Sequence, residues 1–397
     1  MTQARSQLAP PGTPGFFHCV QRCVRRAFLC GQDAYTGQSF DHRKHWVMPP
    51  NRDTHDWEFP YTPLRGFPTA RIARMTQAAC MTQARSQLAP PGTPGFFHCV
   101  QRCVRRAFLC GQDAYTGQSF DHRKHWVEQR IAVLSESFAI AIHAYAVMSN
   151  HLHLVIELAP DAAEAWSDHD VAMRWVRLFP PRERSDEASQ AKCRQLIAQP
   201  DKLQTIRARL ASLSWFMRCL AEPIARRANR EDGCTGRFWE GRFRMQRLCD
   251  ERAVLAAMTY VDLNPVRAGI TTGLHDSTHT SVSARLPARQ SPDIPHAPLD
   301  PILGIRRTSL SISRAEYLAL LDWTGRQLTP GRHGKITTPP PQVLSRIAHD
   351  PQHWTRQVRG IGNRYWRAVG NVEALIALAK DIGQQWLKGL GFAASMK

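Results

Sequence analysis

One stretch decides the fold of this chain: Tyr145-Ala-Val-Met-Ser-Asn-His151-Leu-His153-Leu-Val-Ile-Glu157. Apolar and polar residues alternate from His151 onward, and this pattern predicts a half-buried strand over residues 151–158. Side chains two positions apart share one face of a strand, so His151, His153 and Glu157 point the same way. Two imidazoles on one face suit a single metal ion. A solvated strand edge can carry the same pair, so the two histidines alone do not decide between these interpretations.

A helix is predicted further along the chain, over residues 250–264. Asp250 suits the N-cap, and Pro265 stops the helix just after its last turn. Tyr260 and Asn264 are four positions apart and therefore project from one face. The helix by itself favours a structural interpretation, with Tyr260 in the core and Asn264 as C-cap. The histidine pair upstream favours a functional one, in which the tyrosine and the histidines converge.

These residues resemble the HUH single-tyrosine transposases, and most closely their REP-associated branch. Three motifs carry the resemblance: His151-Leu-His153, Gly236-Arg-Phe-Trp-Glu-Gly-Arg-Phe243 and Tyr260-Val-Asp-Leu-Asn-Pro-Val-Arg-Ala-Gly269. The similarity covers about residues 95 to 285. The His-Leu-His motif alone is a weak signal, whereas all three motifs in this order are far more specific.

The resemblance implies a metal-dependent nuclease site. In that family two histidines hold a divalent cation beside a phosphate of single-stranded DNA, a tyrosine attacks this phosphate, and a polar residue four positions on completes the metal site. Carried over, His151, His153 and Asn264 are the metal ligands and Tyr260 is the nucleophile. By ligand type this set suits Mn2+, and Mg2+ can bind with waters filling its shell. Glu157 could act as a base or as a further ligand.

The elements expected from residue 81 onward follow the strand–helix–strand–strand–helix–strand order of ferredoxin-like folds, and the resemblance implies the same fold. The fold class is therefore α/β of the α+β type, with a ferredoxin-like HUH nuclease domain and an antiparallel sheet over residues 81–285. The expected strands are residues 96–104, 138–148, 151–158 and 238–248. The expected helices between them are residues 119–136 and 211–220, and Pro223 can restart the second one.

Three segments depart from the compact family pattern. A helical insertion is expected at residues 159–210, where charged residues and alanine are dense. A Pro-rich linker is expected at residues 286–301. A small C-terminal helical module is expected at residues 302–397, with helices over 302–325 and 342–392. These departures leave the DNA target and the oligomeric state open.

Residues 1–47 recur letter for letter as residues 81–127. A structural repeat tolerates drift and comes as several stacked units, so perfect identity in two copies does not indicate a solenoid. It indicates a recent tandem duplication, or an error of gene model or assembly. The second copy runs unbroken into the histidine motif, and we assign it to the nuclease domain. Residues 1–80 are then expected to be a duplicated appendage without a functional site.

The charge of the chain indicates its partner. It has 52 basic and 33 acidic residues, a formal net charge of +19. This favours a polyanion, because neutralised phosphates release counterions. Between positions 226 and 247, arginines that can clamp phosphates alternate with aromatics that can stack unpaired bases. The residues expected to bind single-stranded or hairpin DNA are Arg226, Arg227, Arg230, Arg237, Arg242, Arg244, Arg247 and Trp239. The same segment also suits a basic strand whose aromatics fill the core.

Membrane and disulfide-rich classes are not expected. No apolar run approaches the ~20 residues of a membrane helix, and the first residues lack the apolar region of a signal peptide. Eleven cysteines without CxxC pairs in a long chain favour reduced thiols. A zinc site of His98, Cys99 and Cys103 stays open as a minor alternative. We therefore expect a cytoplasmic, nucleoid-associated protein, either a monomer or a homodimer.

The sequence thus predicts a metal-dependent transposase that cleaves and rejoins single-stranded DNA through a 5′-phosphotyrosine, at hairpin-forming repeats. Two alternatives stay open. One is a catalytically inactive or domesticated relative that binds specific DNA sequences without turnover. The other is a nucleic-acid-associated scaffold in which the motifs are coincidental. The intact His151, His153, Tyr260 and Asn264 favour the active enzyme over the inactive relative.

Overall fold

The computed structural model describes residues 85–104, 109–113, 117–271, 273–286, 297–328, 339–348, 350–362 and 366–395, together with Ser39 and Asp41. The expected appendage at residues 1–80 lies outside the described residues apart from those two positions. Most of the expected linker at 286–301 lies outside them as well. No described helix combines the length and the apolar composition that crossing a membrane requires.

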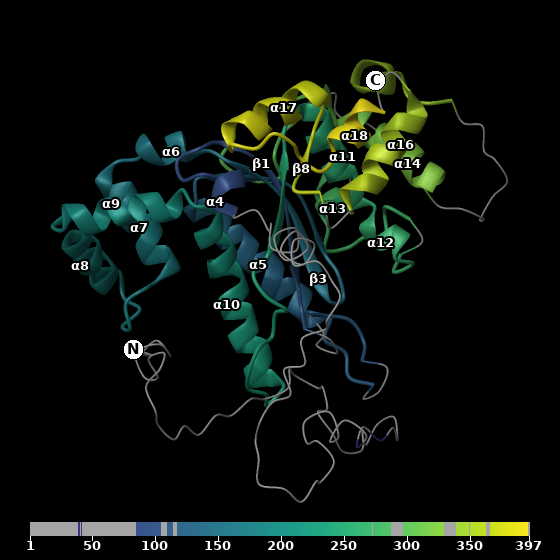
Figure 1. The fold of residues 1–397 in the computed structure, drawn as a ribbon. Coiled ribbons are helices and arrows are strands. Elements are labelled where there is room, and N and C mark those ends of the chain that lie inside the picture. The colour runs from purple at the N-terminus through teal and green to yellow at the C-terminus, as the bar shows by residue number, and fades with distance from the viewer. Residues whose placement is uncertain are drawn as a thin grey trace, which may run out of the picture.

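A mostly antiparallel sheet with helices on both faces forms an α+β fold (Figure 1). Its order is β6-β2-β3-β1-β4-β8, and only β4 and β8 are parallel neighbours. The central strands are β1 (Gly95–Arg102), β2 (Ile140–Val147), β3 (His151–Leu158) and β4 (Arg244–Leu248). Together with α5 (His122–Ser137) and α10 (Leu213–Glu231), they follow the strand–helix–strand–strand–helix–strand order predicted from the sequence.

The strand β3 is buried on both faces, although its alternating pattern predicts burial on one. Leu152, Leu154 and Ile156 pack into a core shared with α5 and α10. Val155 packs into a second core, shared with α11 (Glu251–Asp262). The helices α14 (Arg314–Leu328) and α16 (Pro351–Ile361) pack on α11 from outside. Polar side chains on this face of β3 are therefore enclosed between the sheet and α11.

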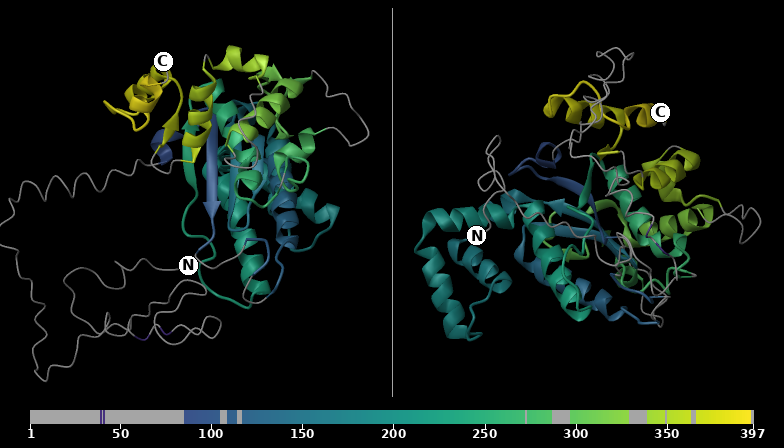
Figure 2. Two further views of the ribbon diagram at one scale, coloured as in Figure 1. Left: turned by 90° about the vertical axis from the view of Figure 1, so that its right-hand side faces the viewer. Right: turned by 60° about the horizontal axis from the view of Figure 1, so that its bottom comes forward.

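The insertion at residues 159–210 is helical as expected, but it holds four described helices where the sequence predicts two or three. They are α6 (Pro160–Glu164), α7 (Asp168–Leu178), α8 (Asp186–Ile197) and α9 (Pro200–Leu210). Their starts follow from local sequence, because Ser167 and Asp170 form a capping box at α7 and Ser185 accepts a backbone N–H at the start of α8. These helices lie on the flank of the molecule away from α14 and α16 (Figures 1 and 2).

The helix α10 runs unbroken through Pro223 to Glu231, whereas the sequence predicts a helix over 211–220 and a restart. Proline has no amide proton, so the carbonyl oxygen of Cys219 loses its intrahelical donor. Arg130 of α5 donates its Nε to that oxygen at 2.9 Å instead. This tertiary contact replaces the missing hydrogen bond, and the helix continues.

The strand β4 is shorter than the predicted strand over 238–248, since regular pairing begins only at Arg244. The preceding segment turns at Gly236, whose φ of 103° is readily adopted only by glycine. Trp239 then forms an isolated bridge with Cys103. The motif from Gly236 to Phe243 is therefore mainly a loop that leads into the sheet.

C-terminal residues extend the sheet at both edges, where the sequence predicts only helices. The strand β6 (Leu303–Gly304) pairs with β2, and β8 (Ala368–Val369) pairs with β4. Gly304 has a φ of 93°, and a Cβ there would lie 2.3 Å from the carbonyl oxygen of Ile140. Only glycine lets this segment reach the sheet, because any side chain would collide with the backbone.

The predicted helix over 302–325 accordingly begins only at Arg314. Before it, β7 (Leu310–Ser313) is extended and pairs with β5 (Pro298–Leu299), which falls within the expected linker. The segment predicted as helical over 342–392 contains β8 as well as α15 (Gln342–Ile347), α16, α17 (Val372–Asp381) and α18 (Leu390–Ala394). The shorter helices α4 (Arg85–Leu88), α12 (Asn264–Arg267) and α13 (Ser281–Arg285) complete the described elements.

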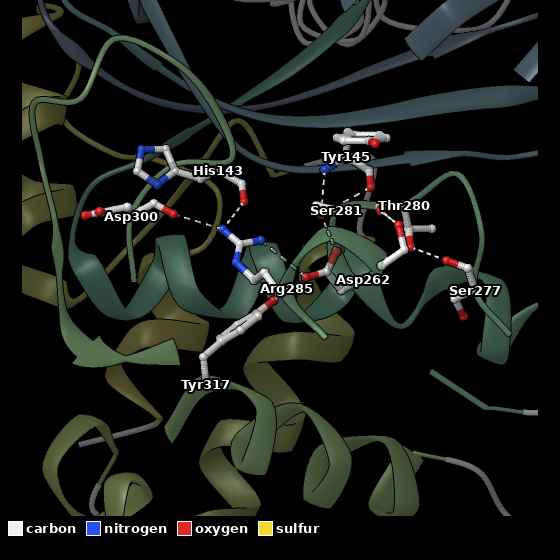
Figure 3. A network of polar contacts seen from close by, with 10 residues as sticks. His143, Tyr145, Asp262, Ser277, Thr280, Ser281, Arg285, Asp300 and Tyr317 are labelled. Carbon is white, nitrogen blue, oxygen red and sulfur yellow. Dashed lines mark hydrogen bonds and ion pairs between the residues drawn. The ribbon is translucent and has the colours of Figure 1, made fainter. Parts of the chain in front are cut away.

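A buried polar network anchors the C-terminal end of α11 (Figure 3). The carboxylate of Asp262 accepts hydrogen bonds from the hydroxyls of Tyr317, at 2.7 Å, and Ser281. Arg285 lies 4.0 Å from this carboxylate and donates to the carbonyl oxygen of His143 on β2. Burial raises the pKa of Asp262 above its usual range, and Arg285 opposes that shift. The network holds the helix that carries Tyr260 against β2, α13 and α14.

Candidate active site

A cavity of about 470 Å³ brings together three of the four residues expected to carry the chemistry: His151, His153 and Tyr260. Its lining comes from β1, β3, β4 and α11, and from residues at and after the end of α16. His98 of β1 adds a third imidazole. The arginines that line the cavity are Arg102, Arg242, Arg244 and Arg367.

A chain of hydrogen bonds determines which nitrogen of His153 carries the proton. Gln246 donates its Nε2 to the carbonyl oxygen of Trp366 at 3.0 Å, so its Oε1 faces Nδ1 of His98, at 2.9 Å. An amide oxygen only accepts, so Nδ1 of His98 carries the proton and Nε2 accepts. This Nε2 lies 2.9 Å from Nδ1 of His153, which must therefore donate. The Nε2 of His153 keeps its lone pair, and it is buried without a hydrogen-bond partner among the described residues.

His151 has the same tautomer for a local reason. Its Nδ1 lies 2.6 Å from Oδ1 of Asn150, which can only accept, so Nδ1 carries the proton. The centroids of the His151 and His153 rings are 4.8 Å apart. An imidazole whose Nδ1 donates to a neighbour and whose Nε2 is free is the form in which histidine commonly binds a metal.

The three histidines are neutral near pH 7. Burial lowers the pKa of His98 to about 4, although the hydrogen bond with Gln246 opposes the shift. Burial, followed by the nearby Arg102 and His98, lowers the pKa of His151 to about 4. The pKa of His153 lies well below its usual value, first because of burial and then because of His98 and His151. The Nε2 lone pairs of His151 and His153 are therefore available, whereas that of His98 accepts from His153.

Tyr260 meets these rings edge-on. Its ring centroid is 5.7 Å from that of His153 and 5.9 Å from that of His98. The guanidinium carbon of Arg267 lies 4.7 Å from the centroid of the same ring, which is a cation–π contact. The hydroxyl faces Gly362, where a Cβ would lie only 2.8 Å from it. Glycine at this position therefore permits the close approach of α16 to the tyrosine.

Asn264 is placed differently from the expectation. The helix α11 ends at Asp262, and Asn264 is the first residue of the short α12, which contains Pro265 at its start. Its side chain is not among those that line the cavity. Its Nδ2 is buried without a hydrogen-bond partner among the described residues. The four-residue spacing from Tyr260 therefore does not bring the carboxamide into the cavity.

The donor set partly fits a divalent metal ion. His151 and His153 each offer a neutral Nε2, which suits ions that accept nitrogen ligands. Within the described part of the chain, no group of three His, Cys, Asp or Glu side chains is placed to hold a metal. Two protein ligands would leave the remaining positions of the ion to water or to phosphate oxygens.

Glu157 and the two cysteines lie outside the cavity. Glu157 is 3.1 Å from Nε2 of the buried His143 and accepts a hydrogen bond from the hydroxyl of Thr308 at 2.6 Å. It is therefore already paired away from the histidine pair. Cys99 and Cys103 pack in the core on the α5 side of the sheet, whereas His98 points to the α11 side. The alternative zinc site is not formed.

The expected DNA-binding residues are distributed over several surfaces, and only Arg242 and Arg244 line the cavity. Arg226 and Arg227 lie on α10. Arg226 forms an ion pair with Glu222, and the guanidinium carbon of Arg227 lies 3.8 Å from the centroid of the Trp126 ring. Arg230 lies in the last turn of the same helix.

Three others donate hydrogen bonds to backbone carbonyl oxygens of the protein. Arg237 donates to the carbonyl oxygen of Glu240 at 3.3 Å. Arg247 lies on the opposite face of β4 and donates to the carbonyl oxygen of Leu88. Trp239 is 8% exposed and donates its Nε1 to the carbonyl oxygen of Ala221, so it fills the core as the structural interpretation predicts.

Several residues of the cavity carry no signal for it in the sequence. The sequence indicates His98 only as a minor zinc candidate and does not single out Gln246, because the contact between them spans 148 positions. Arg267 lies within the quoted tyrosine motif, but its stacking on Tyr260 depends on the turn between α11 and α12. Alternation along β1 could have placed His98 on one face of the strand, but not beside His153.

No protein-family model and no curated protein matches this chain. Among solved structures, the chain is similar to a REP-associated tyrosine transposase bound to a REP hairpin. The identity is 12%, the match covers 54% of this chain and 93% of that one, and the TM-score is 0.26. A likeness of this size does not by itself establish a fold or an activity.

Proposed function

We propose that this protein is a DNA-cleaving and strand-transferring transposase of the HUH single-tyrosine type. In this proposal β1, α5, β2, β3, α10 and β4 form a ferredoxin-like nuclease domain. One observation carries the proposal: Tyr260 packs edge-on against a neutral His153 in a cavity bordered by arginines. The substrate is single-stranded DNA, at hairpin-forming repeats.

The chemistry follows from the residues of the cavity. Oη of Tyr260 attacks the phosphorus of a phosphodiester and gives up its proton to solvent water. The bond from phosphorus to the 3′ oxygen breaks and this oxygen takes up a proton from water, so that a 5′-phosphotyrosine and a free 3′ hydroxyl form. Arg267 over the ring places a positive charge beside the nucleophile. Arg102, Arg242 and Arg244 hold the phosphates of the strand. The reverse attack by a 3′ hydroxyl rejoins the DNA.

His98 and Gln246 hold His153 in the tautomer that leaves its Nε2 free. His151 and His153 are the residues that would hold Mg2+ or Mn2+, whereas Asn264, the third ligand that the resemblance implies, does not line the cavity. The ion, when bound, would supply Lewis-acid polarisation of a phosphoryl oxygen.

The test is the capture of a covalent protein–oligonucleotide adduct on a denaturing gel, with labelled hairpin oligonucleotides and Mn2+. The wild-type protein should form the adduct, and Tyr260→Phe should abolish it while hairpin binding stays within about twofold, because only one hydroxyl is lost. Tyr145→Phe is the matched control, since this phenol bonds to Glu128 and does not line the cavity. Adducts formed by Tyr260→Phe would overturn the assignment of the nucleophile.

A DNA-binding protein without turnover is the second candidate, and two observations favour it. Gly362 lies against the hydroxyl of Tyr260. Among the described residues, no group of three His, Cys, Asp or Glu side chains is placed to hold a metal ion. Wild-type protein that binds hairpins tightly but forms no adduct with either Mg2+ or Mn2+ would decide for this candidate.

A further inference from the structure

A second cavity, of about 450 Å³, lies where the insertion helices meet β4. Its volume falls within the ~300–1,000 Å³ range of small-ligand sites. Trp215 and Phe243 contribute aromatic surface, and Arg85 and Arg209 contribute positive charge. Glu164 is the one acidic residue among those that line it. The cavity thus combines apolar rings with an excess of positive charge.

The residues that lead into β4 separate this cavity from the candidate active site. Along the chain, Arg242 and Arg244 line the active-site cavity, whereas Phe243 between them lines the second one. Met245 lines both cavities. The alternation of an extended chain therefore presents arginines to one cavity and an aromatic ring to the other.

The start of β4, between the two cavities, is basic, because Arg242 and Arg244 are exposed there. The strand β8 pairs only with Arg247 and Leu248, so no described strand covers this side of β4 at positions 244–246. Burial lowers the pKa of Arg85, and repulsion by Arg242 lowers it further. The guanidinium carbon of Arg85 lies 4.5 Å from the centroid of the Phe243 ring, and Phe243 directly follows Arg242 in the chain. A phosphate bound at this edge would therefore lie near two positive charges.

Trp215 is suited to stacking. It is half-buried at the start of α10, with the guanidinium of Arg209 4.5 Å from the centroid of its ring system and that of Arg218 at 5.0 Å. The ring centroid of Trp175 on α7 lies 6.0 Å from that of Trp215. Arg207, by contrast, is occupied by Asp168 and two carbonyl oxygens. An aromatic ring flanked by arginines is the kind of surface on which single-stranded nucleic acids stack.

We propose that the second cavity binds the single-stranded part of the DNA substrate that continues from the active site. The strand crosses the edge of β4 between Arg242 and Arg85, and an unpaired base stacks on Trp215. The occupant is single-stranded DNA rather than a protein segment, because the lining is basic and the Trp215 ring is only half-buried. This inference rests on the proposed function for the position of the strand, but it can be measured without turnover.

The experiment measures equilibrium binding by fluorescence anisotropy, in the full chain carrying Tyr260→Phe. Hairpin oligonucleotides without an extension are compared with hairpins carrying about ten unpaired nucleotides on the 5′ or the 3′ side. An extension on one side should tighten binding at least about tenfold. Trp215→Ala should remove most of this gain, and Arg85→Gln or Arg209→Gln should reduce it together with the salt dependence of binding.

Two matched variants control for nonspecific loss. Trp386→Ala replaces an exposed tryptophan elsewhere, and Arg326→Gln replaces a surface arginine that pairs with Asp322. Both should keep the full gain from the extension. Should Trp215→Ala fail to fold by circular dichroism, the two arginine variants carry the test.

Failure of the inference differs from failure of the proposed function. Equal affinity for hairpins with and without either extension would overturn the second cavity as a strand site, even if wild-type protein forms adducts. An extension effect that depends on Trp215, in a wild-type protein that forms no adducts, would support the strand site and overturn the nuclease.

Discussion

His98 and Gln246 determine which ring nitrogen of His153 carries the proton, although neither is proposed to contact DNA or metal. Gln246 accepts from His98, and His98 accepts from His153, so the lone pair on Nε2 of His153 depends on both. Gln246→Leu removes the first acceptor and lets His98 adopt the other tautomer. The affinity for Mn2+, measured by isothermal titration calorimetry, should then fall about 10–100-fold.

The control for this variant is Gln357→Leu. Gln357 is also buried, but it accepts from Arg252 and lies away from the cavity. Its Mn2+ affinity should equal that of the wild-type protein. An equal loss in both variants would mean that Gln246 only supports packing.

The histidines and Asn264 should respond differently to alanine. His151→Ala and His153→Ala each remove an imidazole whose Nε2 is available in the cavity, and excess Mn2+ should restore their cleavage poorly. Asn264→Ala should lose less and be partly rescued by Mn2+, because this side chain does not line the cavity. Initial rates of adduct formation across a Mn2+ titration measure the difference. Histidine variants that cleave normally in EDTA would contradict the metal site.

At the scale of elements, the helix α11 is held by its last residue. Asp262 is fully buried and bonds to Tyr317 and Ser281, with Arg285 4.0 Å away. Asp262→Ala leaves Arg285 buried without its charged partner, and the free energy of unfolding should fall by about 3–5 kcal/mol. Urea denaturation followed by circular dichroism measures this change.

Asp322→Ala is the matched control for Asp262. Asp322 pairs with Arg326 on the exposed face of α14, where an ion pair contributes at most about 1 kcal/mol. A loss for Asp262→Ala no larger than this would show that the buried network does not anchor α11. A folded Asp262→Ala protein should also form adducts more slowly, because Tyr260 lies one half-turn before the anchor.

At the scale of the whole molecule, the duplicated N-terminus should be dispensable. The strand β1 comes from the second copy and is already paired on both sides, with β3 and with β4. A second strand of the same sequence therefore has no vacant position beside it. A chain that starts at Met81 should keep the thermal midpoint and the adduct-forming rate of the full chain.

Exchange of the two copies is the competing possibility. The first copy could replace β1 only by closing a longer loop, which costs well under ~1 kcal/mol by polymer scaling. Differential scanning fluorimetry and the adduct assay on the truncated chain distinguish the two. A loss of folding or of activity would show that residues 1–80 are structural.

Local pattern determined much of this protein from the sequence. The strands β1, β2 and β3 and the helices α5 and α11 appear close to the residues predicted, and the insertion is helical as expected, because alternation, capping residues and proline act within a few positions. The same reasoning placed His151 and His153 on one face of β3 and Tyr260 on α11. The prediction for β4 is too long at its start, because the chain turns at Gly236. The prediction for α10 ends too early, because the contact of Arg130 with the carbonyl oxygen of Cys219 lets the helix continue through Pro223.

The tertiary structure alone decided which groups meet. Only the register of β1 between β3 and β4 brings His98 to His153 and Gln246, and only the break between α11 and α12 keeps Asn264 out of the cavity. The edge strands β6 and β8 form from two-residue segments with no periodic signal, because their pairing depends on a sheet that already exists. The sequence thus determines the elements and their faces. The contacts that tune the histidines depend on packing between residues far apart in the chain, which no local pattern encodes.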